Sequence, residues 1–208
     1  MSGKKLKKSP WLTMWLEPRQ TIRSIVESDP KFHFKALSCI YGIPFLLYIV
    51  QLFSLGDKVG LPLILLFSVL VGPFLGMAIL SLSALLITWT GSWIGGRSRY
   101  LKVRTAVSWA KITEIVNLLA WIVLILIFGR ELFSQTFATQ MPNASQMGLL
   151  AIATLVELLL SVWSFILLLK GVSVVQGFSL WKALLNLILA AGCLMVAGWI
   201  LGIVVWLL

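Results

Sequence analysis

Five long apolar runs, separated by short polar segments, constrain this 208-residue chain more than any other feature. A membrane-spanning helix needs about 20 consecutive apolar residues. The chain is 60% hydrophobic and only 12% charged, which is more apolar surface than a soluble domain of this length could bury. We therefore predict an all-α polytopic membrane protein, a five-helix transmembrane bundle with spans at about residues 36–55, 61–94, 112–129, 147–169 and 183–208.

The second run is too long for a straight crossing. A helix over residues 61–94 would extend about 51 Å, whereas the hydrocarbon core is about 30 Å thick. Proline inside a helix removes one backbone donor and clashes with the preceding turn. We therefore predict a bend at Gly72 and Pro73.

The basic residues predict the orientation of the spans. With five crossings, all 17 Lys and Arg residues except Lys58 and Arg130 lie on one side of the membrane. Cytoplasmic loops carry an excess of Lys and Arg, so we expect a cytoplasmic N-terminus and an external C-terminus. A double crossing by residues 61–94 would put the basic loop 97–111 opposite the basic N-terminus, and we reject it for that reason.

Residues 1–35 form a basic segment before the first span. Its uninterrupted apolar stretch, Trp11–Leu16, is too short for the core of a signal peptide. Aromatic and apolar residues beside lysines are typical of an amphipathic helix that lies in the headgroup plane of an anionic leaflet. The alternative is a cytoplasmic lead-in packed against the bundle. The candidate lipid-facing anchors are Lys4, Lys5, Lys7, Lys8, Trp11 and Trp15.

Glu157, near the middle of the fourth span, is the strongest candidate for a functional residue. An ionisable group at that depth costs at least about 2.5 kcal/mol on insertion scales unless it is protonated or partnered. One interpretation is a packing role, with a hydrogen bond to a hydroxyl of Tyr41, Tyr48, Ser81 or Ser83. The other is a site for a coupling ion or a substrate.

Glu114 and Asn117 are the next candidates for an intramembrane polar site. Lys111, Glu114 and Asn117 follow one another at intervals of three residues, which places them on one helix face near the cytoplasmic boundary. A local salt bridge with a polar cap is the simplest prediction for this spacing.

Small residues at helical spacing predict close contacts between helices. Such contacts can form within the bundle or between copies of the chain, and we expect mainly the former. The GxxxG pairs are Gly72/Gly76, Gly91/Gly95 and Gly198/Gly202. Cys39 and Cys193 lie inside apolar runs, where we expect them to act as small packing residues.

Catalytic motifs are missing from the sequence. It contains no HExxH, GxSxG or GxxxxGK motif, and His33 is its single histidine. We therefore expect no enzyme activity, no metal site and no cofactor. The net charge of +10 comes from residues that flank apolar runs rather than from a continuous basic face, which argues against nucleic-acid binding.

Three segments give the chain a family resemblance. They are W-x-x-M-W-x-x-P-R-x-T-I-R-x-I-V-x-x-x-P from Trp11 to Pro30, the inner loop GGRSRYLKVRTAVSWAK, and WSFILLLKGVSVVQGFSLWKALLN before the last span. Together with the five spans, they resemble a prokaryotic Yip-domain membrane protein. The resemblance covers nearly the whole chain and implies location in the cell inner membrane.

Eukaryotic Yip proteins are five-span proteins that bind prenylated Rab GTPases, and one another, through a long cytoplasmic N-terminal region. This chain departs from them, because its predicted N-terminal segment covers only residues 1–35. Its Tyr41-Gly42-Ile43-Pro44 sequence falls inside a predicted span and not in the cytoplasm. We therefore do not expect Rab binding.

Two hypotheses for function follow. The first is a non-enzymatic membrane scaffold or partner-binding protein that interacts with anionic lipids and with other membrane proteins or copies of itself. The alternative is a small transporter or channel, with a midplane site formed by Glu157 and the broken second helix at Gly72 and Pro73.

Overall fold

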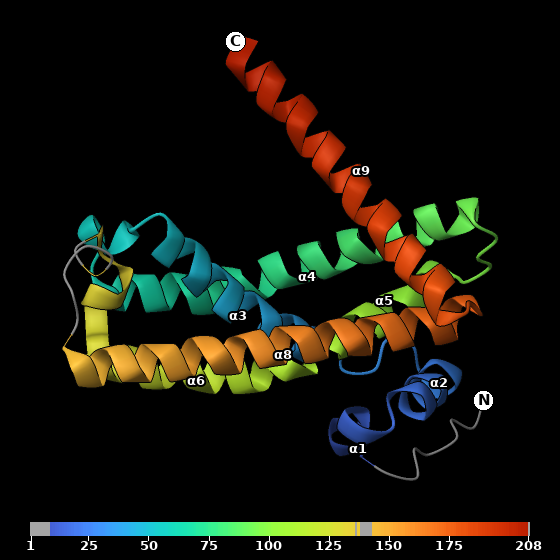
Figure 1. Ribbon diagram of the computed structural model, residues 1–208, viewed down its shortest axis with the longest axis horizontal. Coiled ribbons are helices and arrows are strands. Elements are labelled where there is room, and N and C mark those ends of the chain that lie inside the picture. Colours follow the sequence, from blue (N-terminus) through green and yellow to red (C-terminus); the bar gives the residue numbers. More distant parts are fainter. Residues whose placement is uncertain (1–8, 136, 138–142, 208) are drawn as a thin grey trace. The chain divides into compact units, whose positions relative to one another are not determined.

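The protein is helical along nearly all of the chain that the structure describes (Figure 1). The computed structural model describes residues 9–135, 137 and 143–207. Its elements are α1 (Pro10–Leu16), α2 (Pro18–Ser28), α3 (Phe34–Leu52), the 3₁₀ helix η1 (Leu55–Asp57), α4 (Leu61–Trp93), α5 (Tyr100–Ala110), η2 (Lys111–Thr113), α6 (Glu114–Phe128), η3 (Gly129–Phe133), α8 (Ala144–Gln176) and α9 (Leu180–Leu207).

Five helical segments are long and apolar enough to cross a membrane, which confirms the predicted all-α polytopic class. They are Phe34–Leu52, Leu61–Trp93, Tyr100–Phe133, Ala144–Gln176 and Leu180–Ile200. The fourth helix extends beyond the predicted 147–169 at both ends. The added residues at the two ends of α8 remain helical because their peptide groups form hydrogen bonds within the same helix.

The segment between the second and third predicted spans is largely helical. Residues Tyr100–Ala110 form α5, which leads through η2 directly into α6. Val103, Ala106, Val107 and Trp109 of α5 are buried.

The chain divides into two compact units that share the long helices α4 and α8. Unit 1 contains Met1–Phe32, Leu80–Ala110 and Ile166–Leu208. Unit 2 contains His33–Ile79 and Lys111–Phe165. Each of these helices therefore contributes one part to each unit.

In unit 1, the N-terminal segment packs onto α5. Two helices are present where one was predicted, because Pro18 starts α2 immediately after α1 ends. Ile22 and Ile25 of α2 are fully buried, as is Trp109 of α5. The ring of Trp109 lies 5.1 Å from the ring of Trp11. Trp109 is thus a core residue and not the interfacial residue that its place near a span end suggests.

Buried amides join the ends of three helices in unit 1. The Thr90 hydroxyl of α4 donates to Asn186 Oδ1 of α9 at 2.7 Å, and Asn186 Nδ2 donates to the Ile87 carbonyl at 3.1 Å. Gln176 Nε2, at the end of α8, donates to the same carbonyl at 3.3 Å. Gly91 leaves room for both amides, since a Cβ at that position would displace the Gln176 side chain. These polar groups are satisfied inside the protein, as burial requires.

In unit 2, α3 and α4 approach each other closely at glycines. A Cβ on Gly42 would lie 2.7 Å from the carbonyl carbon of Gly72 and 2.9 Å from the backbone nitrogen of Gly76. The Gly72/Gly76 pair is therefore an intramolecular packing motif, as expected. The neighbouring Pro73 lies inside an uninterrupted α4, and the predicted bend there stays a prediction.

Replacing Gly42 tests this close approach. We expect Gly42→Ala to lower the free energy of unfolding by about 1–3 kcal/mol, because the added methyl group collides with backbone atoms that cannot move aside. Gly198→Ala in α9 is the matched control, since no atom lies within 4 Å of its added Cβ. Thermal unfolding in detergent, followed by circular dichroism, measures both. Equal stability of the two variants would contradict the proposed contact.

Candidate functional site

A polar groove opens between α3, α6 and α8 in unit 2. It consists of two adjoining cavities of about 120 and 240 Å³, which share Tyr48, Asn117, Trp121 and Glu157. The smaller is lined in addition by Gln51, Ala120, Leu124, Leu132, Leu150, Ala153, Thr154, Val156 and Leu160, and the larger by Tyr41, Pro44, Phe45, Lys111 and Glu114. The three sequence-predicted polar residues, Glu114, Asn117 and Glu157, thus lie in one place.

The α6 side of the groove carries a short charged ladder. Lys111 Nζ lies 3.8 Å from Glu114 Oε1, and Asn117 Nδ2 donates to Glu114 Oε2 at 2.8 Å. Both contacts follow from the three-residue spacing on one helix face, and they confirm the predicted local salt bridge with its polar cap. The Glu114 carboxylate therefore has two partners inside the protein.

The α3 side contributes two tyrosines and a glutamine. Lys111 Nζ lies 4.9 Å from the ring centre of Tyr41, close enough for a cation–π interaction. Gln51 Nε2 donates to the Leu132 carbonyl at 3.2 Å. Sequence reasoning missed Gln51, although Tyr41, Tyr48 and Gln51 share a helix face by their spacings of seven and three residues.

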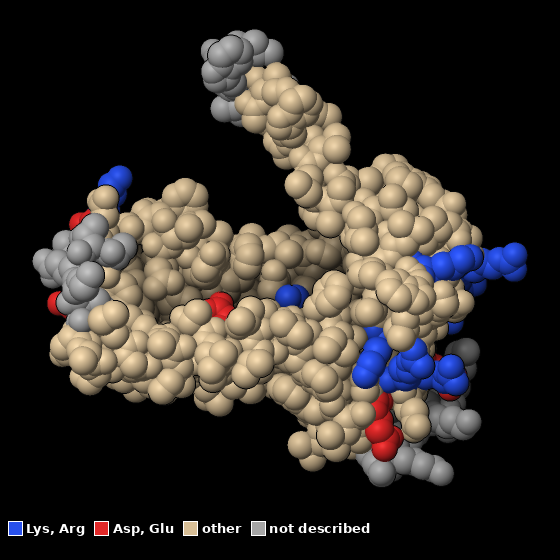
Figure 2. Space-filling view, viewed as in Figure 1, with Lys and Arg blue, Asp and Glu red and all other residues tan. Residues whose placement is uncertain are grey.

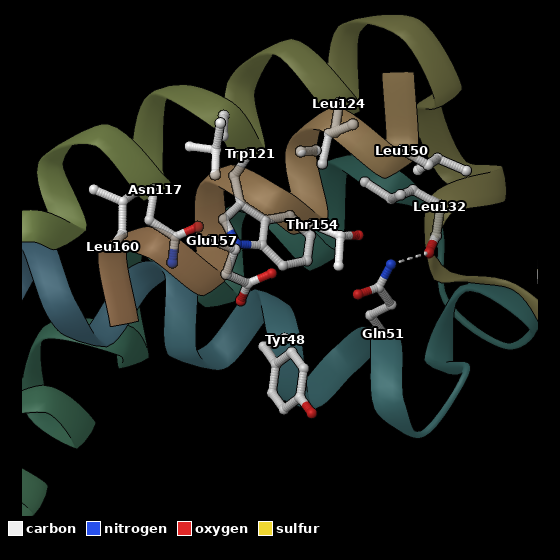
Figure 3. A pocket seen from close by; sticks show the side chains of 13 residues that line it. Tyr48, Gln51, Asn117, Trp121, Leu124, Leu132, Leu150, Thr154, Glu157 and Leu160 are labelled. Atoms are coloured by element: carbon white, nitrogen blue, oxygen red, sulfur yellow. Dashed lines mark hydrogen bonds between the residues drawn. The ribbon is translucent and has the colours of Figure 1, made fainter. Parts of the chain in front are cut away.

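Glu157 projects from α8 into this groove. In Figure 3 its carboxyl group points from α8 toward α3, with Trp121 on one side and Tyr48 on the other. The carboxyl group is exposed, and within the described part of the chain it has no hydrogen-bond partner. The predicted hydrogen bond to Tyr41, Tyr48, Ser81 or Ser83 is therefore absent from the structure. The orientation of α8 places the Glu157 side chain in the open groove, where it forms no hydrogen bond with any of these four hydroxyl groups.

The charges in the groove do not balance. Lys111 offsets Glu114, with which it pairs, and ionised Glu157 would leave the groove with a net charge of −1. Glu157 lies thirteen residues after Ala144, or about 20 Å along α8. A carboxylate at such depth is costly unless it meets a partner. Figure 2 shows that the surface along this half of α8 is otherwise tan, neither acidic nor basic.

The other predicted site residues lie elsewhere. Gly72 packs against α3, and neither it nor Pro73 lines the groove. Trp11 contacts Trp109 within unit 1, whereas the four lysines Lys4, Lys5, Lys7 and Lys8 lie outside the described residues. Most of the basic side chains visible in Figure 2 gather over the α4–α5 connection and over α2.

Metal ligands do not cluster in the groove. Within residues 9–135, 137 and 143–207, no three His, Cys, Asp or Glu side chains lie close enough to hold a metal ion. The groove instead offers hydrogen-bonding amides, hydroxyls, aromatic rings and one unpaired carboxyl group. It can therefore recognise a polar or charged group that enters it from the membrane.

The family model of the Yip1 domain matches residues 12–206, nearly the whole chain. The chain belongs to the Yip1 domain family. This Yip1 domain protein is thus a multi-pass membrane protein with a polar groove among its apolar helices. No curated protein and no solved structure matches the chain.

Substitutions of Glu157 and Asn186 test whether Glu157 stabilises the folded protein. We expect Glu157→Leu to leave the free energy of unfolding unchanged or to raise it, because no hydrogen bond is lost and an unpaired ionisable group is removed from a membrane-spanning helix. Asn186→Leu should lower it by about 1–3 kcal/mol, since Asn186 is fully buried and bonded to Thr90 and Ile87. Denaturant titrations in mixed micelles measure both. A loss in Glu157→Leu as large as in Asn186→Leu would assign Glu157 to packing.

Proposed function

We propose that this Yip1 domain protein is a non-enzymatic partner-binding protein whose polar groove receives a transmembrane segment of another membrane protein. The observation that carries the proposal is the Glu157 carboxyl group, which lies in the groove without a hydrogen-bond partner among the described residues. Asn186 and Gln176, by contrast, are satisfied within the protein. A polar group left unsatisfied at membrane depth is destabilising by itself, so its presence favours a role in binding.

The lining of the groove supports a protein segment as the ligand. Leu124, Leu150 and Leu160 border the polar side chains and provide apolar surface for a helix from the bilayer. Transmembrane helices associate through close packing combined with hydrogen bonds between polar side chains. Both elements are present in the groove.

The transporter hypothesis receives less support than partner binding. It required Glu157 and a broken helix at Gly72–Pro73 to form one midplane site. Helix α4 is continuous through Pro73, and the residues that line the groove include neither member of that pair. We therefore propose partner binding alone.

Site-specific photocrosslinking in native membranes tests the groove. We expect p-benzoylphenylalanine at Leu160, which lines the groove, to give discrete protein adducts. The same probe at Leu126, which is 80% exposed on α6 but does not line the groove, should give lipid adducts only. Mass spectrometry identifies the adducts.

Two further variants make that result specific. Glu157→Leu should abolish the protein adducts at Leu160, whereas Glu131→Gln removes a carboxylate outside the groove and should preserve them. Adducts that persist in Glu157→Leu, or that form equally at Leu126, would refute the proposed function.

We also propose that α1 lies on the cytoplasmic leaflet of the cell inner membrane and contacts anionic lipids. Leu12 and Leu16 support this placement, because they are 74% and 86% exposed beside the basic N-terminal run. Apolar residues of α2 cannot contribute, since Ile22 and Ile25 are buried in the protein. The charge bias of the connections supports a cytoplasmic N-terminus and an external C-terminus.

A fluorescent label tests the depth and the side of α1 together. We expect nitrobenzoxadiazole attached to Leu12→Cys, in a background without Cys39 and Cys193, to be quenched by lipid-borne quenchers. Dithionite should reduce it in inside-out but not in right-side-out vesicles. Gln20→Cys, on the exposed polar side of α2, should show the same sidedness without lipid quenching. Equal lipid quenching at both positions would contradict the interfacial placement.

A further inference from the structure

We propose that the group received by the groove is a cation, the side chain of a lysine near the middle of a partner's transmembrane helix. This inference rests on the proposed function and specifies its ligand. The charge of the groove, its aromatic lining and the position of Glu157 along α8 support it.

Charge complementarity selects a cation. The charged residues that line the groove are Lys111, Glu114 and Glu157. Lys111 and Asn117 already satisfy the Glu114 carboxylate, at 3.8 and 2.8 Å. Glu157 is the acidic group left over, so one entering positive charge makes the groove neutral. Opposite charges that meet inside a membrane offset part of each other's desolvation cost.

The aromatic lining suits an ammonium group. Lys111 shows that the groove accommodates one, because its Nζ lies 4.9 Å from the ring centre of Tyr41. Tyr48 and Trp121 line the same groove on either side of Glu157 (Figure 3). Their ring faces attract cations more strongly where water is excluded. A lysine that pairs with Glu157 would therefore lie between two rings.

Depth distinguishes the partner from a second copy of this chain. Glu157 lies about 20 Å along the 33-residue helix α8, a position that a membrane-embedded segment of a partner can reach. Apart from Lys111, the basic residues of this chain lie outside α3, α4, α6, α8 and α9 or within the two terminal turns of these helices. Lys111 lies within the Tyr100–Phe133 span but is already paired with Glu114, so we expect a different protein rather than a second copy to supply the cation.

Designed peptides test the proposal directly. The full-length protein is reconstituted in phosphatidylcholine vesicles, with a donor dye on Lys58→Cys in the background without Cys39 and Cys193. The probes are Leu-Ala peptides of about 20 residues, a length that spans the bilayer. They carry an acceptor dye and a single central Lys, Gln, Glu or Leu. Energy transfer at increasing peptide density gives the association constant.

We expect the Lys peptide to associate about tenfold more strongly than the Leu peptide, as one intramembrane polar contact would give. Glu157→Gln should bring this ratio close to one, while Glu131→Gln, which removes a carboxylate outside the groove, should leave it intact. Monodisperse elution and an unchanged near-ultraviolet spectrum show that Glu157→Gln is folded.

Three results would overturn the proposal. Equal association of the Lys and Gln peptides would show that hydrogen bonding suffices without charge. Equal association of the Lys and Leu peptides, with Glu157-dependent crosslinks at Leu160 retained in native membranes, would refute the cation and leave the proposed function standing. Loss of the Lys preference when phosphatidylethanolamine is added would identify a lipid amine as the occupant.

Discussion

A bilayer offers no hydrogen-bond partners to peptide groups, and every part of this structure depends on that constraint. The chain meets it with helices, each of which pairs its own backbone. Polar side chains inside the membrane also need hydrogen-bond partners within the protein. Thr90 and Asn186 do so by bonding to each other, and Glu114 does so through Lys111 and Asn117. Glu157 stands out because the described chain offers its carboxyl group no such partner, which is why we connect it with binding.

The close glycine contacts and the polar groove of unit 2 involve different sets of helices. At Gly42 and Gly72 the backbones of α3 and α4 approach so closely that a single methyl group does not fit. That seam fixes one wall of unit 2. The groove between α3, α6 and α8 lacks such close packing and keeps its polar side chains accessible. A rigid seam beside an open groove holds the groove residues in position without filling the space between them.

Different residues of the N-terminal segment support the two interpretations that the sequence allowed. Ile22, Ile25 and Trp109 pack as a protein core, as the lead-in alternative required. Leu12 and Leu16 remain exposed, as the interfacial helix requires. One segment can serve both purposes because α1 and α2 are separate helices, each with its own apolar face. The proline that separates them was visible in the sequence, whereas the direction of each face was not.

The sequence by itself determined the helices, their approximate bounds and the ladder from Lys111 to Asn117, because backbone pairing and three-residue spacing are local properties. It also carried the family resemblance that the Yip1 domain match confirms. Only the tertiary structure decided that Glu157 shares a groove with that ladder and that Pro73 does not. Helices that are apolar on every side carry no periodic signal for their rotation. Which residues face each other therefore depends on packing between segments far apart in the chain.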